Sequence, residues 1–473
     1  MLFSQLAIIL PEKYGFLGEN SYFCTRNMMN WQQLISNKRL GQEHRHPERH
    51  DDRTEFKRDY DRLIFSAPFR RLQNKTQVFP LPGSIFVHNR LTHSLEVASV
   101  GMSLGNDVAQ QLTMRHPELK DALFQEIGQI VSTACLAHDL GNPPFGHSGE
   151  KAMEAYFLEG PGCDLQREVS PTFWNDLTHF EGNANAFRLL THQFKGRRPG
   201  GFVMTYSTLA SIVKYPYSSS AAGKKGKFGF FESEKESYLR IAEELGMPCL
   251  SAMGEPLRFA RHPLVYLVEA ADDICYEIMD IEDAHKLKIL SHDETMQMLL
   301  GFFDAESQQH ILQRINEEGV TDDNEKVVYL RACVIGKLEN ECVRVFVEHE
   351  EDILNATFQG SLIDHIGELQ KEAYERCCQL SVKKIYKSRP VLDVELSGYQ
   401  IIQTLMQQFI GAAVHPERFY SKHLISRVSS QYDIDAPDLE TRLMAVIDYI
   451  SGMTDVYALD VYQKINGISL PIV

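Results

Sequence analysis

Hydrophobic positions recur at helical spacing along most of this chain. Between residues 126 and 138, apolar side chains fall on or beside one helix face: Ile127, Ile130, Val131, Ala134 and Cys135. Residues 91–102, 364–386 and 437–464 show the same spacing, and Pro437 is well placed to open the last of these helices. There is no convincing run of alternating strand positions and no repeat of fixed period. The pattern predicts an all-α fold.

The length of 473 residues fits either about two or three structural units or one large helical body. We divide the chain into an N-terminal extension over residues 1–40, a helical core over 41–290 that carries the candidate chemistry, and a C-terminal helical region over 291–473. The last region is expected to pack on the core and complete the fold.

Charge and cysteine content narrow the possible functions. The 64 acidic and 48 basic residues argue against a protein that coats nucleic acid, although a local basic groove stays possible. The nine cysteines include no CxxC pair and fit a reducing cytoplasm better than a disulfide framework. The apolar residues 1–10 lack a basic start and a small-residue cleavage site, so we interpret them as a soluble leader. No segment approaches the roughly 20 apolar residues of a membrane span, and we expect no membrane association.

His138 and Asp139 are the first candidates for chemistry. An imidazole beside a carboxylate at the end of an apolar helix suits a metal site, although a buried histidine and a solvated aspartate are the commoner arrangement there. Gly141 suits the left-handed position just beyond a helix end. Because Pro143 and Pro144 cannot continue the helix, the His-Asp pair is expected in its last turn.

Two further segments can supply ligands to the same ion. One carries His93, and the other carries the adjacent Asp272 and Asp273. Asp272, Tyr276 and Asp280 stand at i, i+4 and i+8 and therefore share one helix face. We assign Asp272 as the ligand and Asp273 as a supporting or ion-pairing residue, with the reverse assignment as the alternative. Ligands of this kind accept Mn²⁺ or Mg²⁺, and also Fe, Co or Ni.

Other polar segments are interpreted as solvated. His44, His46 and His50 lie in the densely charged stretch 41–62, where surface histidines are more common than metal ligands. Residues 215–229 are rich in Gly, Ser and Lys, which predicts a flexible loop. A role for its lysines in gating a phosphate site is the less common alternative.

A series of motifs follows in order from about residue 50 to the C-terminus. They are Ser66–Phe79 (SAPFRRLQNKTQVF), Arg90–Glu96 (RLTHSLE), His138–His147 (HDLGNPPFGH), His179–Asn183 (HFEGN), Lys214–Pro216 (KYP), Glu269–Tyr276 (EAADDICY) and Asp448–Asp455 (DYISGMTD). Together they resemble the deoxynucleoside triphosphate (dNTP) triphosphohydrolases, the dGTPase-like branch of the HD-domain metal-dependent phosphohydrolases. The resemblance implies an HD-domain helical core with additional C-terminal helices. Because such sequences typically begin near Met28, residues 1–27 depart from the family pattern.

The resemblance also implies a reaction and its catalytic groups. Family members hydrolyse a dNTP to the deoxynucleoside and inorganic triphosphate by attack of water at the α-phosphorus. The divalent ion would be held by four side chains: His93, His138, Asp139 and Asp272. His147 would protonate the leaving 5′-oxygen while Glu150, three residues later, orients its ring. His179 resembles a further active-site histidine near the scissile bond.

The remaining family positions imply contacts to the nucleotide. Arg90 and Lys214 match phosphate-binding positions, and Asn142 lies beside the phosphates at a place where some relatives carry His. Tyr276 would stack under the deoxyribose and Asp280 would accept its 3′-hydroxyl. The positions against sugar and base are those of Gln77 and Val78.

Two rival functions and several partners stay open. One rival is an HD phosphohydrolase acting on nucleoside monophosphates or signalling nucleotides, and the other is a sensor of nucleotides or single-stranded DNA with dispensable chemistry. The family implies a homo-oligomer, hexameric or built from dimers. Some of its members need one dNTP as an allosteric activator, and single-stranded DNA is a further possible partner.

Overall fold

The computed structural model describes residues 28–43, 52–79, 87–121, 123–223, 226–252 and 254–469. The leader expected at residues 1–10, the rest of the departing segment 1–27 and the three histidines of 44–50 lie outside the described residues. Within the described ranges the chain is helical and β pairing is limited to isolated bridges, so the predicted all-α fold is confirmed. No helix in these ranges is both long and apolar enough to cross a membrane.

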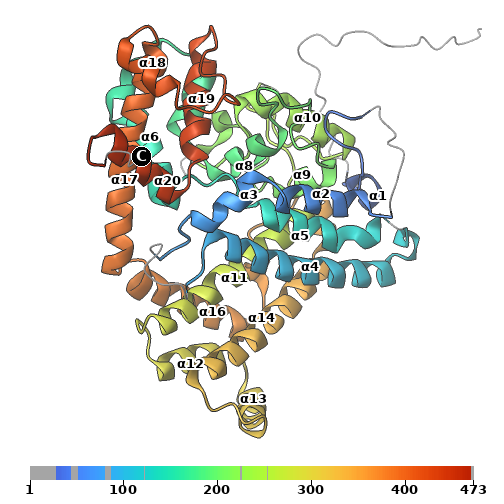
Figure 1. Cartoon of the computed structure of the whole chain (residues 1–473). Coiled ribbons are helices and arrows are strands. Elements are labelled where there is room, and N and C mark those ends of the chain that lie inside the picture. Colours follow the sequence, from blue (N-terminus) through green and yellow to red (C-terminus); the bar gives the residue numbers. More distant parts are fainter. Residues whose placement is uncertain are drawn as a thin grey trace, which may run out of the picture.

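Two long helices form the centre of the molecule (Figure 1). Helix α4 (Arg90–Arg115) begins at Asn89, whose side chain accepts the backbone N–H groups of Leu91 and Thr92. It packs along α5 (Ile127–Ala137), every residue of which is buried except Gln129. Glycines allow the close approach: a Cβ added at Gly105 would lie 2.7 Å from the Cα of Gly128.

A third long helix, α11 (Leu264–Lys286), packs against both α4 and α5. The remaining helices of the first 263 residues surround this centre. They are α1 (Trp31–Leu34), α2 (Glu55–Ile64), α3 (Ala67–Arg71), α6 (Gly146–Leu158), α7 (Pro171–Thr178), α8 (Gly182–Thr191), α9 (Tyr206–Ile212) and α10 (Lys235–Glu244). Since α4, α5 and α11 meet side by side, residues from three distant parts of the sequence can converge between them.

The helices that follow α11 fall into two groups (Figure 1). The first group lies on the α11 and α4 side: α12 (His292–Leu300), α13 (Ala305–Glu317), α14 (Asp323–Glu348), α15 (Glu350–Leu354) and α16 (Glu368–Leu380). The second group is organised by α17, which packs along α6: α17 (Arg389–Val414), α18 (Phe419–Ile425), α19 (Leu439–Ser451) and α20 (Asp455–Ile465). The boundary that we expect at residue 290 stays a prediction.

Two of the expected long helices are interrupted. Residues 437–464 form α19 and α20 with a short break between them, and Asp438, rather than Pro437, caps the first. Residues 364–386 contain α16, which continues into a π-helical segment, Ser381–Ile385. Such π segments are frequent at functional sites, and this one delivers Tyr386 toward α11.

Candidate metal centre

Three predicted ligands converge where α4, α5 and α11 meet. The Nε2 atom of His93 lies 3.1 Å from Oδ1 of Asp272, and Nε2 of His138 lies 3.5 Å from the same oxygen. Their potential ligand atoms all lie within 4.8 Å of one another. In the described part of the chain, no other group of three His, Cys, Asp or Glu residues has this spacing. The arrangement can hold one divalent ion.

Asp139 lies at the edge of this cluster. Its Oδ1 atom accepts a hydrogen bond from Nη1 of Arg90 at 2.8 Å and one from the side-chain amide of Asn142. Its Oδ2 atom is buried without a hydrogen-bond partner. The Nε2 atom of His138 is also buried without one, while the Nδ1 of the same ring donates to the carbonyl of Cys135 at 2.6 Å.

These buried atoms fit a metal ion. An unsatisfied buried polar atom costs about 1–3 kcal/mol, and Nδ1–H donation leaves Nε2 of His138 as a free lone pair. A cation bound between the rings and carboxylates would satisfy Nε2 and add favourable charge interactions. The donor set of imidazole nitrogens and carboxylate oxygens therefore suits a hard or borderline divalent ion.

Electrostatics separates the two adjacent aspartates of α11. Burial opposes ionisation of Asp272, but His138 and His93 hold its pKa well below the usual range. In contrast, burial raises the pKa of Asp273 to about 7 despite the nearby Lys214. Asp273 is not part of the His/Asp cluster. The geometry thus favours Asp272 over Asp273 as the ligand.

The segment after α5 differs from its predicted conformation. Helix α5 ends at Ala137, so His138 is its cap and Asp139 already belongs to the following turn. The left-handed conformation expected at Gly141 is wrong, because the positive φ angles occur at Phe145 (62°) and Gly146 (56°). Gly141 is instead required by packing, since an added Cβ would lie 2.0 Å from the carbonyl oxygen of Gly182.

His147 and Glu150 form the predicted contact in the first turns of α6. Nδ1 of His147 lies 3.0 Å from Oε2 of Glu150, and the other carboxylate oxygen accepts the N–H of Gly182 at 2.9 Å. This hydrogen bond with Glu150 raises the pKa of His147. The imidazole is 70% exposed, so its second nitrogen is accessible.

Lys227 is a charged neighbour of this pair, and the sequence analysis considered it only as one of the loop lysines that could gate a phosphate site. Its Nζ lies 2.7 Å from Glu181, and its charge acts on His147 and Glu150. The loop that carries it is folded onto the core, because Phe228 and the following aromatic residues are buried. The expectation of a flexible loop is therefore wrong for residues 226–229. The only signal in the sequence was the density of lysines between 224 and 227, two of which lie outside the described residues.

His179 lies at the end of α7, close to the same loop. Its Nδ1 atom contacts the carbonyl of Asn175 at 3.0 Å. A Cβ added at Gly226 would lie 3.5 Å from Cδ2 of the His179 ring. Lys214, the second predicted phosphate contact, pairs with Glu269 at 3.0 Å, and Arg261 contacts the same carboxylate.

The predicted sugar-binding face of α11 has an additional member. The Tyr276 ring lies 6.3 Å from the His93 ring and 6.2 Å from the Tyr386 ring, measured between centroids. The hydroxyl of Tyr386 donates to Asp280 at 2.8 Å. No motif pointed to Tyr386, which follows the π-helical segment. Nearer the N-terminus, Oε1 of Gln77 is buried without a hydrogen-bond partner and Val78 is half-buried.

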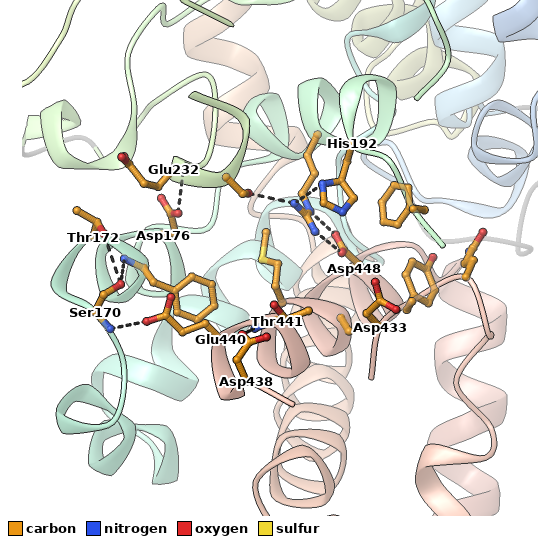
Figure 2. Close-up of a pocket in the computed structure, with 18 residues that line it drawn as sticks. Ser170, Thr172, Asp176, His192, Glu232, Asp433, Asp438, Glu440, Thr441 and Asp448 are labelled. Carbon is orange, nitrogen blue, oxygen red and sulfur yellow. Dashed lines mark hydrogen bonds and ion pairs between the residues drawn. The ribbon is translucent and has the colours of Figure 1, made fainter. Parts of the chain in front are cut away.

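A separate cavity lies between α7, α8 and α19. Figure 2 shows this cavity, which has a volume of about 350 Å³ and contains none of the predicted site residues. Of its 18 lining residues, six are acidic: Asp176, Glu232, Asp433, Asp438, Glu440 and Asp448. Arg188 joins α8 to α19 there, donating to both oxygens of Asp448 at 2.8 Å and to Glu234 at 2.7 Å. The cavity therefore lies at the interface of these helices and is not part of the His/Asp cluster.

Comparisons with known proteins agree with this geometry. A family model described as HD domain matches residues 90–198, and one described as phosphohydrolase-associated domain matches residues 368–464. The first match contains His93, His138, Asp139 and His147. The helical fold, the His/Asp cluster and these matches define a hydrolase of the HD-domain class.

Curated relatives narrow the class further. A deoxyguanosinetriphosphate triphosphohydrolase-like protein of Pseudomonas aeruginosa is 38% identical, with 94% of this chain and 100% of the relative covered. One of the same name from Synechocystis sp. is 37% identical over 93% and 100%. A deoxyguanosinetriphosphate triphosphohydrolase of Yersinia enterocolitica is 29% identical over 87% and 93%. The chain belongs to the dGTP triphosphohydrolase-like family of HD-domain phosphohydrolases.

Proposed function

We propose that this protein hydrolyses dNTPs to deoxynucleosides and inorganic triphosphate. The proposal rests on the His/Asp cluster with its unsatisfied buried atoms. It also rests on the His147–Glu150 pair, which follows the turn after Asp139. We assign His93, His138, Asp139 and Asp272 as the residues that would hold the divalent ion. Bound there, the ion would polarise the α-phosphate and acidify water.

The residues of the chain account for the proton that the leaving group needs. Water attacks the α-phosphorus, the bond between this phosphorus and the 5′-oxygen breaks, and that oxygen must gain a proton. Glu150 holds Nδ1 of His147, which leaves Nε2 on the exposed edge of the ring for donation to the 5′-oxygen. The hydrogen bond with Glu150 also raises the pKa of His147, which favours the protonated imidazole that donates to the 5′-oxygen.

Cationic and donor groups would bind the triphosphate. Arg90 holds Asp139 with one nitrogen, and its other terminal nitrogen lies close to Gly146. We propose phosphate contacts for Arg90 and Lys214, with Asn142 as a further donor beside the phosphates. His179 is proposed as a further active-site histidine near the scissile bond. Lys214 would exchange part of its pairing with Glu269 for a phosphate oxygen.

The α11 face would select the sugar. We propose that Tyr276 stacks under the deoxyribose, where a 2′-hydroxyl would clash, and that Asp280 accepts the 3′-hydroxyl. Tyr386 already donates to one oxygen of Asp280, so this carboxylate is held in place with its other oxygen available. The unpaired Oε1 of Gln77, with Val78 beside it, is proposed to contact sugar or base.

A substrate panel tests the proposed reaction. The four dNTPs, singly and as mixtures, are incubated with the protein and Mn²⁺, Mg²⁺ or Co²⁺, and the products are resolved into triphosphate, pyrophosphate and phosphate. The expected result is triphosphate and deoxynucleoside in equal amounts, with ribonucleotides resistant. Release of phosphate from monophosphates alone would refute the proposal. Activity that arises only in mixtures would identify an activating dNTP.

A further inference from the structure

The turn between the His138-Asp139 pair and His147 is held by the C-terminal helices. Asp455, the first residue of α20, is 6% exposed and accepts three hydrogen bonds. Its Oδ1 atom accepts the N–H of Phe145 at 2.9 Å. Its Oδ2 atom accepts the N–H of Thr76 at 2.8 Å and the hydroxyl of Thr76 at 2.5 Å. One buried carboxylate thus joins three distant segments of the chain.

Lys75 holds the other end of the same turn. Its buried Nζ donates to the carbonyl oxygen of Asn142 and, at 3.1 Å, to that of Ser451. Arg71 adds a bond to the carbonyl of Gly452 at 3.0 Å. Lys75 therefore connects the end of α19 to the start of the turn at Asn142. Asp455 connects the start of α20 to the end of the turn at Phe145.

Between these two attachments the backbone adopts positive φ angles, which residues with a side chain rarely adopt. Phe145 is a bulky residue with a φ of 62°, and Gly146 follows with 56°. Helix α17 presses on the same place, because a Cβ added at Gly398 would lie 2.5 Å from Cβ of Phe145. Such a conformation persists only where the surroundings fix it.

This turn connects the two chemical parts of the site. Asn142, at its start, bonds Asp139, and His147 follows its end in α6. We propose that Asp455 and Lys75 are positioning residues that set His147 relative to Asp139, so that the C-terminal helices take part in proton delivery without touching a reacting atom. This inference rests on the proposed function only for the role of His147. The alternative is a purely structural attachment of α20 to the core.

Asp455→Asn tests the proposal, with Asp448→Asn as its matched control. The amide at 455 would bring its own N–H groups against the N–H of Phe145 or Thr76, so at least one bond is lost. Asp448 fastens the same C-terminal helices to α8, and its side chain accepts its hydrogen bonds from Arg188 rather than from the turn. Both variants should melt at lower temperature than the parent protein. Only Asp455→Asn should lower kcat for dGTP with Mn²⁺, by about tenfold to a hundredfold, with KM within about twofold.

Hydrogen exchange supplies a readout that does not depend on activity. The peptide that covers residues 142–150 should exchange faster in Asp455→Asn and unchanged in Asp448→Asn. Equal kcat losses in both variants, or unchanged exchange in Asp455→Asn, would overturn the positioning role. If the parent protein hydrolyses no dNTP but the peptide responds as expected, the attachment of the turn stands and the proposed substrate fails.

A second pair of variants applies if Asp455→Asn does not fold. Thr76→Val removes only the hydroxyl donor to Asp455, and Thr76→Ser keeps it. We expect a smaller fall in kcat for Thr76→Val and near-parent kcat for Thr76→Ser. The same kcat in both variants as in the parent protein would count against the proposal.

Discussion

Two adjacent aspartates of α11 differ in their distance from the His/Asp cluster and in their pKa. The adjacent Asp272 and Asp273 have the same side chain and are both half-buried, yet Asp272 lies 3.1 Å from His93 and has a lowered pKa, whereas the pKa of Asp273 is raised to about 7. Helix-face reasoning predicted this difference, because one turn of α11 can direct only one of them toward α4 and α5.

Substitution of each aspartate by asparagine tests the assignment. Asp272→Asn should lose bound metal and nearly all activity, since it removes an anionic ligand. Asp273→Asn should keep the metal, because Asp273 is not part of the His/Asp cluster and an amide of similar size replaces a carboxyl whose pKa is raised to about 7. Metal content per chain after gel filtration, with dGTP turnover, measures both. Retention of metal by Asp272→Asn with loss in Asp273→Asn would reverse the assignment.

The His147–Glu150 pair makes a prediction about pH. His147 acts as an acid only when protonated, so the rate should fall as pH rises through its pKa. The hydrogen bond from Glu150 raises that pKa. In Glu150→Gln the pKa returns toward its usual value of about 6.5, and the alkaline limb of kcat moves to lower pH. The amide oxygen can still accept the N–H of Gly182, which limits structural damage.

Lys151 provides a control with the opposite sign. Its positive charge lowers the pKa of His147, and its side chain is 55% exposed. Lys151→Gln should leave the alkaline limb in place or shift it slightly to higher pH. A limb that moves to lower pH in both variants would show that another group titrates.

At the scale of helices, the site depends on how closely α4 approaches α5. The approach is possible because Gly105 faces Gly128 without side chains between them. Gly105→Ala should force the helices apart and destabilise the protein by about 1–3 kcal/mol. It should also weaken metal binding, because His93 lies in α4 and His138 caps α5. Urea unfolding and metal titration measure the two effects.

A glycine on another helix gives the comparison. A Cβ added at Gly336 in α14 would meet no atom within 4 Å. Gly336→Ala should therefore stabilise the protein, by up to about 1 kcal/mol, because alanine is the better helix former. Metal affinity should not change. An equal loss of stability in both variants would contradict the packing argument.

Sequence patterns were sufficient for some of these elements and not for others. The helical spacing identified α4 and α5, and a helix was expected at α11 from the face shared by Asp272, Tyr276 and Asp280. His93, His138 and Asp272 converge as expected. Tyr386 was missed, and Lys227 was considered only as a loop lysine, because their partners, Asp280 and Glu181, lie far away in the sequence. Gly141 was misread because local rules for helix ends ignore the helix that packs on the glycine. Tertiary contact, which no local pattern encodes, explains each of these differences.

At the scale of the whole molecule, the cluster couples three segments of a 473-residue chain. An ion that binds the folded state alone stabilises it by about 2.7 kcal/mol at a hundredfold excess over its Kd. Added Mn²⁺ should therefore raise the melting temperature of chelator-treated protein, and Asp272→Asn should show no such rise. Thermal melting with and without Mn²⁺ measures it. An equal rise in the variant would locate the stabilising ion elsewhere.

Because residues 140–147 are attached at both ends, this turn should not tolerate inserted or deleted residues. Surface loops usually accept inserted residues, and the exposed connection 318–322 between α13 and α14 is such a place. Residues 140–147 are not, because both the carbonyl of Asn142 and the N–H of Phe145 are fixed by partners from elsewhere in the chain. One inserted residue there would rotate α6 by about 100° relative to its attachments. Natural insertions and deletions should therefore gather in 318–322 and leave 140–147 at constant length.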